Sequence, residues 1–380
     1  MKREIVLTNA QVITRNELFR GTVRVMNGII TGIDRGKSVG LPSIDLEGDY
    51  LLPGLVELHT DNLEKHFVPR PGVRWPSMAA MLSHDASIVA AGITTVFDAL
   101  AIGDSFENST RLRDLKEMVE AIEGAQEKGI LRADHFLHLR CEIGYPQVLD
   151  LFESFVNDAL VKFTSLMDHT PGQRQFTRIE KFHQYYQGKY GFTQAEMEKF
   201  VQQRLENQVK YARKHRGALL EVCRRLGLPV ASHDDTTADH VIEAASEGIV
   251  VSEFPTTTEA AQTARRLGLN VLVGGPNLVL GGSHSGNVSA LELAQLHLVD
   301  VFSSDYVPGS LIQGVFLMHQ QLEVPLPEAV AKITINPAQI ASLADRGTIQ
   351  LGNRADLIRV KLDRSIPVIR NVWRSGQIVF

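Results

Sequence analysis

Histidines and acidic residues follow short apolar segments at several points of this 380-residue chain. The first such segment reads Glu57-Leu-His59-Thr-Asp61. Because side chains two residues apart lie on the same face of a β-strand, His59 and Asp61 would point into one small volume. An imidazole nitrogen beside a carboxylate oxygen suits a divalent ion such as zinc or manganese. The spacing therefore predicts a metal site at the end of this segment.

Four later segments end in the same way, on Glu142, His233, Glu253 and Asp305. A single terminal acid is often a helix N-cap, and a single histidine is often packed in a core or solvated. Helix capping does not readily explain why five segments end in a histidine or an acidic residue at equivalent places in a repeating pattern. The segment that ends in Asp168-His169 leaves open which residue faces inward, so His169 is either a ligand or a residue that supports one.

We expect two divalent ions, zinc or manganese, at the point where these side chains meet. The predicted metal ligands are His59, Asp61, Glu142, His169, His233 and Asp305. Asp305 is also the predicted catalytic residue, which would orient the attacking water and receive its proton. The spacing alone decides neither the identity of the metal nor the ligand that bridges the two ions.

The elements that must position these residues are short apolar strands that alternate with longer helical patterns. This alternation is typical of βα units and predicts a (β/α)8 TIM-type barrel, whose active site lies at the C-terminal ends of the strands. In the first strand, we expect Val56 and Leu58 to pack against helices, so that Glu57 and His59 point into the barrel. The expected strands span residues 54–61, 94–99, 135–142, 161–168, 229–233, 249–253, 270–274 and 300–305.

Both ends of the chain, residues 1–50 and 346–380, read as short strands separated by turns. Asn27-Gly28, between two apolar runs, is a strong hairpin signal. An isolated hairpin is only marginally stable, so we expect the two ends to pool their strands in one small β-sandwich domain. The barrel domain would then span residues 51–345.

The longest connection in the barrel region runs from about residue 170 to residue 228. Its first half is polar, aromatic and basic, and its second half, from Glu196 to Arg225, has a charged helical pattern. Because it is longer than a crossover between parallel strands requires, we expect it to form a lid over the site.

Cationic side chains and a glycine-rich segment indicate an anionic substrate. Residues 281–287 precede a predicted helix, and the backbone N–H groups of such a segment can hold a phosphate. Plain turns also explain such glycines, and solvated surface charge explains cations in loops. The predicted substrate contacts are Lys65, Arg70, Arg140, Ser283 and His284.

The composition argues against several classes of protein. Hydrophobic residues make up 44% of the chain and the formal net charge is −5, which indicates a globular protein and argues against a general nucleic-acid binder. The chain starts without a signal-peptide pattern, and no apolar run approaches the ~20 residues of a membrane-spanning helix. The two cysteines suit a reducing compartment. We expect a cytoplasmic protein with a small-molecule partner and neither a nucleic-acid nor a membrane partner, and we leave homo-oligomer formation open.

Longer sequence blocks around these residues resemble the amidohydrolase superfamily, among them LPGLVELHTD at 52–61 and GNRADL at 352–357. This resemblance implies the same barrel, with a sandwich domain made from both termini. A typical member has His-x-His on the first strand, where this chain has His59 and Asp61. The carboxylated lysine common on the fourth strand has no well-placed counterpart, and Glu142 is its expected substitute.

Further blocks resemble one branch of that superfamily, the PhnM proteins of the C–P lyase pathway. They include HTDNLEK at 59–65, HLRCE at 138–142, ASHDD at 231–235 and GGSHSGN at 281–287. The resemblance implies hydrolysis of a phosphorylated ribose phosphonate, α-D-ribose 1-methylphosphonate 5-triphosphate, to its 5-phosphate and pyrophosphate. Two other functions stay open, an amide or cyclic-imide hydrolase like dihydroorotase or aminoacylase, and an inactive barrel scaffold. The retained donor residues argue against the scaffold.

Overall fold

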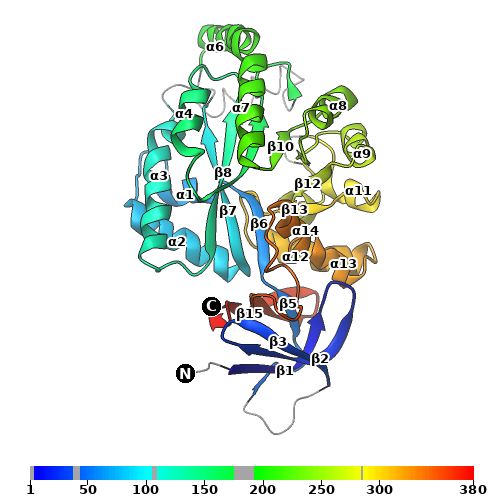
Figure 1. Ribbon diagram of the computed structural model, residues 1–380. Helices are drawn as coiled ribbons and strands as arrows, with labels where there is room; N and C mark the ends of the chain where they lie inside the picture. The colour runs from blue at the N-terminus through cyan, green and yellow to red at the C-terminus, as the bar shows by residue number, and fades with distance from the viewer. Residues whose placement is uncertain (1–3, 37–42, 105–108, 175–191, 284–285) are drawn as a thin grey trace.

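The computed structural model describes residues 4–36, 43–104, 109–174, 192–283 and 286–380. Two sheets dominate it: a barrel of parallel strands, and beside it a smaller sheet with strands from both ends of the chain (Figure 1). Among the described residues, no helix combines the length and the apolar character needed to cross a membrane.

The larger sheet has eight parallel strands, which neighbour one another in chain order from β6 to β13. They are β6 (Leu55–Thr60), β7 (Ile93–Ile102), β8 (Asp134–Glu142), β9 (Val161–Met167), β10 (Val230–His233), β11 (Val251–Glu253), β12 (Asn270–Gly274) and β13 (Val301–Ser303). The barrel closes where Thr60 and Asp305 form a parallel bridge, and Thr60 Oγ1 donates to the Asp305 carbonyl at 2.7 Å. All the predicted strands are present, and the predicted barrel is confirmed.

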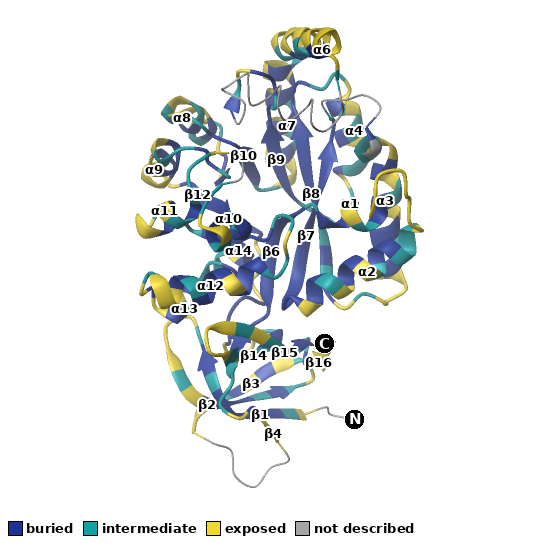
Figure 2. Cartoon of the chain, turned by 180° about the vertical axis from the view of Figure 1, so that it is seen from behind, coloured by how far each residue is buried: buried dark blue, intermediate teal, exposed yellow. Residues whose placement is uncertain are grey.

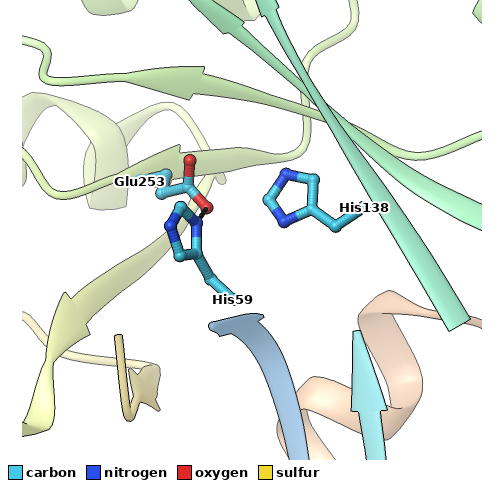
Figure 3. Close-up of side chains that lie close together, drawn as sticks. All are labelled: His59, His138 and Glu253. Atoms are coloured by element: carbon cyan, nitrogen blue, oxygen red, sulfur yellow. Dashed lines mark hydrogen bonds and ion pairs between the residues drawn. The ribbon is translucent and has the colours of Figure 1, made fainter. Parts of the chain in front are cut away.

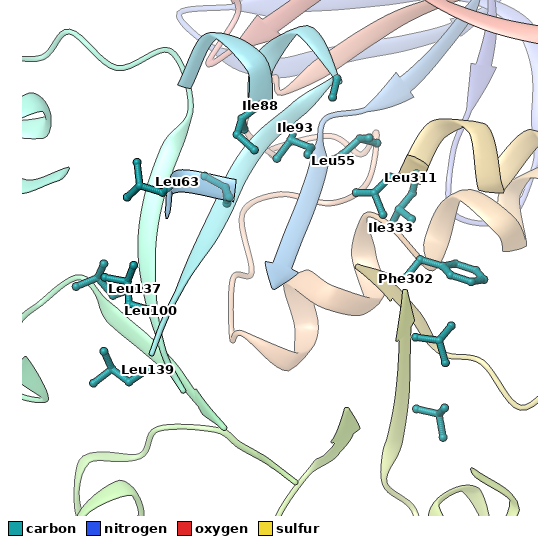
Figure 4. Packing of buried hydrophobic residues seen from close by; sticks show 14 of the residues in the cluster. Leu55, Leu63, Ile88, Ile93, Leu100, Leu137, Leu139, Phe302, Leu311 and Ile333 are labelled. Atoms are coloured by element: carbon teal, nitrogen blue, oxygen red, sulfur yellow. The ribbon is translucent and has the colours of Figure 1, made fainter. Parts of the chain in front are cut away.

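Helices cover the outside of the barrel, with their buried faces against the strands and their exposed faces outward (Figure 2). Leu55, Ile88, Leu137 and Phe302 are part of the apolar layer between strands and helices (Figure 4). Burying one such side chain contributes roughly 1.5–3 kcal/mol, so this layer holds the wall of the barrel firmly. The helices are α1 (Asn62–Phe67), α2 (Ser77–Ala90), α3 (Thr110–Glu127), α4 (Val148–Phe155), α6 (Gln194–Asn207), α7 (Arg213–Leu226), α8 (Ala238–Ser246), α9 (Thr258–Arg266), α10 (Gly275–Leu280), α11 (Ala290–Gln295), α12 (Ser310–Gln321), α13 (Leu326–Ala331) and α14 (Ile335–Ile340).

A second apolar cluster fills the interior of the barrel, with one or two residues from most strands and with Ala338 of α14. Val56 and Leu58 belong to this cluster, so the expectation that they face the helices is wrong. The pairing of β6 with β7 shifts register between Leu55 and Val56 and again between Glu57 and Thr60, which breaks the strict alternation of faces. Glu57 accepts hydrogen bonds from the backbone N–H groups of Ser304 and His59, whereas His59 reaches Glu253.

The smaller sheet combines β1 (Glu4–Ile13), β2 (Leu18–Met26), β3 (Ile29–Arg35), β4 (Ile44–Asp45), β5 (Tyr50–Pro53), β14 (Leu357–Asp363), β15 (Ile366–Arg374) and β16 (Gln377–Ile378). The predicted hairpin at Asn27-Gly28 is confirmed: both residues have positive φ, 52° and 82°, as a tight primed turn requires. One core cluster joins Val25 to Leu357 and Trp373, so both ends of the chain share a buried face. The exact domain bounds stay a prediction.

The long connection after β9 contains the predicted helical half, in α6, a π-helical turn at Gln208–Ala212, and α7. Thr193 and Glu196 form a reciprocal capping box at the start of α6, which fixes where that helix begins. Residues 175–191, in the predicted polar half of the connection, lie outside the described residues. The lid stays a prediction.

Candidate metal centre

Polar side chains form a layer above the apolar interior, toward the C-terminal ends of the strands. His59, His138 and Glu253 come from β6, β8 and β11 and meet there (Figure 3). Glu253 lies at the centre of the layer. Its Oε1 accepts from His59 Nδ1 at 2.7 Å, and its Oε2 accepts from His233 Nδ1 at 2.7 Å and from Ser165 Oγ at 2.8 Å.

The Glu253 side chain is fully buried. Burial opposes its charge, but the charge of His59 and the hydrogen bond from His233 outweigh burial and hold the pKa of Glu253 well below its usual range. Because a carboxylate only accepts, both imidazoles donate their Nδ1 hydrogens to it. Their Nε2 atoms face the other way, which is the arrangement found in histidines that bind metal ions.

A second group gathers at the ends of β8, β9 and β10. Glu142 Oε2 accepts from His169 Nδ1 at 2.7 Å, and Glu142 Oε1 accepts from Arg204 Nη2, on α6, at 2.7 Å. The Nε2 atoms of His169 and His233 lie 3.7 and 3.4 Å from Asp234 Oδ2. Burial disfavours charge on His169, but Glu142 and Asp234 outweigh burial and raise the pKa of His169 to about 9. A divalent ion would displace that proton when it binds.

Asp61 and Asp305 lie at the junction between the first and last strands of the barrel. Asp305 N donates to the His59 carbonyl at 3.2 Å, and Asp305 has a positive φ of 51°. Non-glycine residues held in this conformation are concentrated at functional sites. Burial raises the pKa of Asp305 and the charge of Asp61 adds to the rise, although His59 and Arg140 oppose it. A carboxylate with a raised pKa is suited to accept a proton.

The donor set fits divalent metal ions. Within the described part of the chain, Asp61 Oδ1 and Asp234 Oδ2 are buried and have no hydrogen-bond partner. Leaving a buried polar atom unsatisfied costs about 1–3 kcal/mol or more, and a cation would remove that cost. Imidazole nitrogens and carboxylate oxygens are also the ligands that zinc and manganese take. Two groups at this end of the barrel have ligand atoms within 4.8 Å of one another, His59 with His138 and Glu253, and His169 with His233 and Asp234. Asp61 and Asp305 lie close enough to His59 to interact through their charges.

The C-terminal ends of the barrel strands form the mouth of the barrel, and the structure brings all six predicted ligands there. It also separates the two candidates at the end of β9: His169 faces His233, whereas Asp168 accepts from the Thr170 N–H at 3.1 Å and from Gln208 Nε2 at 3.4 Å. The role of these residues as ligands stays a prediction.

The predicted substrate contacts lie in different surroundings. Arg140 is 9% exposed, and its Nε has no hydrogen-bond partner among the described residues. Lys65 is exposed and donates to the Tyr306 carbonyl at 3.0 Å, next to Asp305. Arg70 is exposed on the loop after α1, and Ser283 is half-buried in the loop after α10. His284 lies outside the described residues.

Four residues at the mouth were not among the predicted site residues: His138, Asp234, Glu253 and Arg204. In the sequence, Glu253 is marked only as a strand end, and Asp234 follows His233 in the same Ser-His-Asp-Asp run. Their positions at the ends of predicted strands could therefore have identified both as site residues. Arg204 reaches Glu142 from a helix 62 residues further along the chain, and no local pattern marks it.

A separate His–Asp–His cluster lies on the outer side of the barrel wall, under α2. Asp98 Oδ1 accepts from His84 Nε2 at 2.6 Å, and Asp98 Oδ2 accepts from His135 Nδ1 at 2.7 Å. His135 Nε2 lies 3.4 Å from Asp85 Oδ1. Burial disfavours charge on His135, but Asp98 outweighs burial, with help from Asp85, and raises the pKa of His135 to about 9. His135 lies between two aspartates, and Arg132 also pairs with Asp85 at 3.0 Å, so these contacts tie α2 to the barrel wall.

Comparison with known proteins identifies the family of this chain. No family model matches the chain. The α-D-ribose 1-methylphosphonate 5-triphosphate diphosphatase of Escherichia coli (strain K12) is 48% identical over 378 residues, which cover 99% of this chain and 100% of that protein. The chain belongs to the family of this diphosphatase. The resemblance inferred from the sequence blocks is thus confirmed.

Solved structures show the same fold at low sequence identity. The 5-methylcytosine deaminase of Klebsiella pneumoniae has a TM-score of 0.65 at 14% identity, with 99% of this chain and 98% of that chain covered. The N-acetylglucosamine-6-phosphate deacetylase of Pasteurella multocida has a TM-score of 0.62 at 13% identity, with 99% of each chain covered. These likenesses show that this chain shares the fold of the two proteins.

Proposed function

We propose that this protein hydrolyses α-D-ribose 1-methylphosphonate 5-triphosphate to the 5-phosphate and pyrophosphate, with divalent ions held at the barrel mouth. The observation that carries this proposal is the 48% identity to the Escherichia coli diphosphatase over nearly the whole of both chains. The buried histidines and carboxylates at the strand ends support the metal dependence, because they include carboxylate oxygens that accept no hydrogen bond from the described part of the chain.

Divalent ions bound there would lower the pKa of the attacking water and offset charge on the phosphoryl oxygens. The protein's own contribution is to hold the reacting groups and to move one proton. Asp305 would orient the water and accept its proton, because burial has already raised the pKa of this carboxylate. Asp61 and His59 lie close enough to influence the pKa of Asp305, so they would set the pH range in which Asp305 can accept a proton.

The cationic side chains at the mouth would bind the phosphate groups. Arg140 is 9% exposed, and its guanidinium would donate to a phosphoryl oxygen. Lys65, beside Tyr306, would meet the outer phosphates at the rim. Pyrophosphate is a capable leaving group when its charge is neutralised, so a strong general acid is not required.

Stripping and restoring the metal tests this function. We expect chelator-treated protein to be inactive, and protein reloaded with zinc or manganese to release pyrophosphate and the ribosyl 5-phosphate, both resolved by ³¹P NMR. Full activity in metal-free protein would contradict the metal dependence. No release of phosphate, together with robust turnover of a cyclic imide or an N-acyl amino acid, would assign the protein to the amide-hydrolysing branch of the superfamily. Inactivity of the reloaded protein on every substrate would favour the scaffold.

A further inference from the structure

Asp234, directly after β10, has an unusual backbone and an unusual carboxylate. Its φ is 56°, and its N–H donates to the Glu253 carbonyl at 2.9 Å. Its side chain is almost fully buried, and its Oδ2 has no hydrogen-bond partner in the described residues. A buried carboxylate oxygen that lies on a left-handed backbone, and that faces two imidazoles without accepting a hydrogen bond from the described residues, calls for an explanation.

The adjacent aspartate shows what a structural carboxylate at this position looks like. Asp235 accepts from Arg174 through Oδ1 and from Ser232 and Ser252 through Oδ2. Both of its oxygens are therefore satisfied by the protein. The contrast within one dipeptide indicates that Asp234 serves a different purpose from Asp235.

Two imidazoles present the same nitrogen to Asp234. Ligand atoms of His169, His233 and Asp234 lie within 4.8 Å of one another, and the contacts at 3.7 and 3.4 Å to Asp234 Oδ2 do not have hydrogen-bond geometry. Behind each imidazole, a carboxylate accepts the Nδ1 hydrogen: Glu142 behind His169 and Glu253 behind His233, each at 2.7 Å. This arrangement fixes the tautomer that leaves Nε2 as a ligand.

We propose that Asp234 is a metal ligand together with His169 and His233, and that Glu142 and Glu253 are positioning residues. This inference rests on the metal dependence of the proposed function and reassigns Glu142 from ligand to the support of His169. Glu253 has a second task, because its other oxygen holds His59 Nδ1. One carboxylate therefore orients an imidazole on each side of the mouth, and its loss would disturb both.

Metal binding tests these assignments without reference to turnover. Purified Asp234→Asn, Glu253→Gln and wild-type protein would be stripped, reloaded with cobalt(II) and examined by mass-spectrometric metal analysis, competitive chelator titration and visible absorption. Asp168→Asn is the matched control, since Asp168 lies at the same mouth but its oxygens face Thr170 and Gln208. Circular dichroism would establish that each variant is folded.

For Asp234→Asn we expect one metal equivalent to be lost or bound at least ~10-fold more weakly, with a changed cobalt spectrum and the other equivalent retained. For Glu253→Gln we expect ~10- to 100-fold weaker binding of both equivalents, because an amide offers only one accepting oxygen to two imidazole donors. Asp168→Asn should bind like wild type. Wild-type affinity and spectrum in Asp234→Asn would overturn its assignment and leave the proposed function standing. Two tightly bound ions in a wild-type protein that hydrolyses no phosphoanhydride would overturn the function and leave the ligand assignment standing.

Discussion

Substitution of Asp98 by asparagine tests whether the buried cluster under α2 is an ion pair that stabilises the barrel wall. Both oxygens of Asp98 accept from histidines, His84 and His135, and all three side chains are at most 1% exposed. The pKa of His135 is raised from 6.5 to about 9. The pKa of folded His135 is higher than its ordinary value by about 2.5, and each pKa unit is equivalent to about 1.36 kcal/mol. The ion pair therefore contributes roughly 3 kcal/mol to the free energy of unfolding, which is within the range for breaking a buried charge pair.

The contribution depends on pH in a defined direction. Because the pKa of folded His135 lies above its unfolded value, the stabilisation is complete at pH values below about 6.5 and is lost as the pH rises through about 9. We therefore expect Asp98→Asn to lower the free energy of unfolding by roughly 3 kcal/mol near pH 6 and by roughly 1.4 kcal/mol near pH 8 from this source. The lost hydrogen bond to His84 adds about 1 kcal/mol at every pH.

The assay is chemical denaturation followed by circular dichroism at pH 6, 8 and 9.5. Asp239→Asn, at an exposed position in α8, is the control and should change the free energy of unfolding by less than about 0.5 kcal/mol. An equal loss for Asp98→Asn at pH 6 and pH 9.5 would show that the charge on His135 is not the source of the stabilisation, and would refute the reasoning.

Two further predictions concern the mouth of the barrel. Asp305→Asn should keep the fold and much of the bound metal but lose nearly all turnover, because the amide does not accept a proton; near-wild-type kcat would show that Asp305 is not the base. Arg140→Met should raise KM for the triphosphate while metal content stays at the wild-type level, because its buried Nε has no partner among the described residues; a loss of metal with unchanged KM would assign Arg140 to the support of the ligands.

Most of the fold was predictable because a repeating pattern marks it. Apolar strands at regular intervals indicate a parallel barrel, and a parallel barrel brings all strand ends to one mouth, so the strand-end residues His59, Glu142 and His233 could be placed together from the sequence. The hairpin at Asn27-Gly28 was predictable because few dipeptides adopt two positive φ angles at low cost.

Other features depend on contacts that the sequence does not encode locally. The faces of β6 were predicted incorrectly because two register shifts interrupt its alternation, and register depends on the neighbouring strand β7. The pairing of Arg204 with Glu142 depends on where a long connection returns to the barrel. The cluster around Asp98 was not predicted because a buried charge is recognisable only once its partners are known.

The position of oxygen from water in the products tests the central claim most directly. In ¹⁸O-labelled water, attack at the α-phosphorus places the label in the ribosyl 5-phosphate and leaves the pyrophosphate unlabelled, and ³¹P NMR distinguishes the two products. We predict this outcome for metal-loaded protein, because the proposed site activates water at the α-phosphorus and neutralises the outer two phosphates as the leaving group. Label in the pyrophosphate would contradict that placement of the substrate, and labelled orthophosphate would contradict the diphosphatase reaction itself.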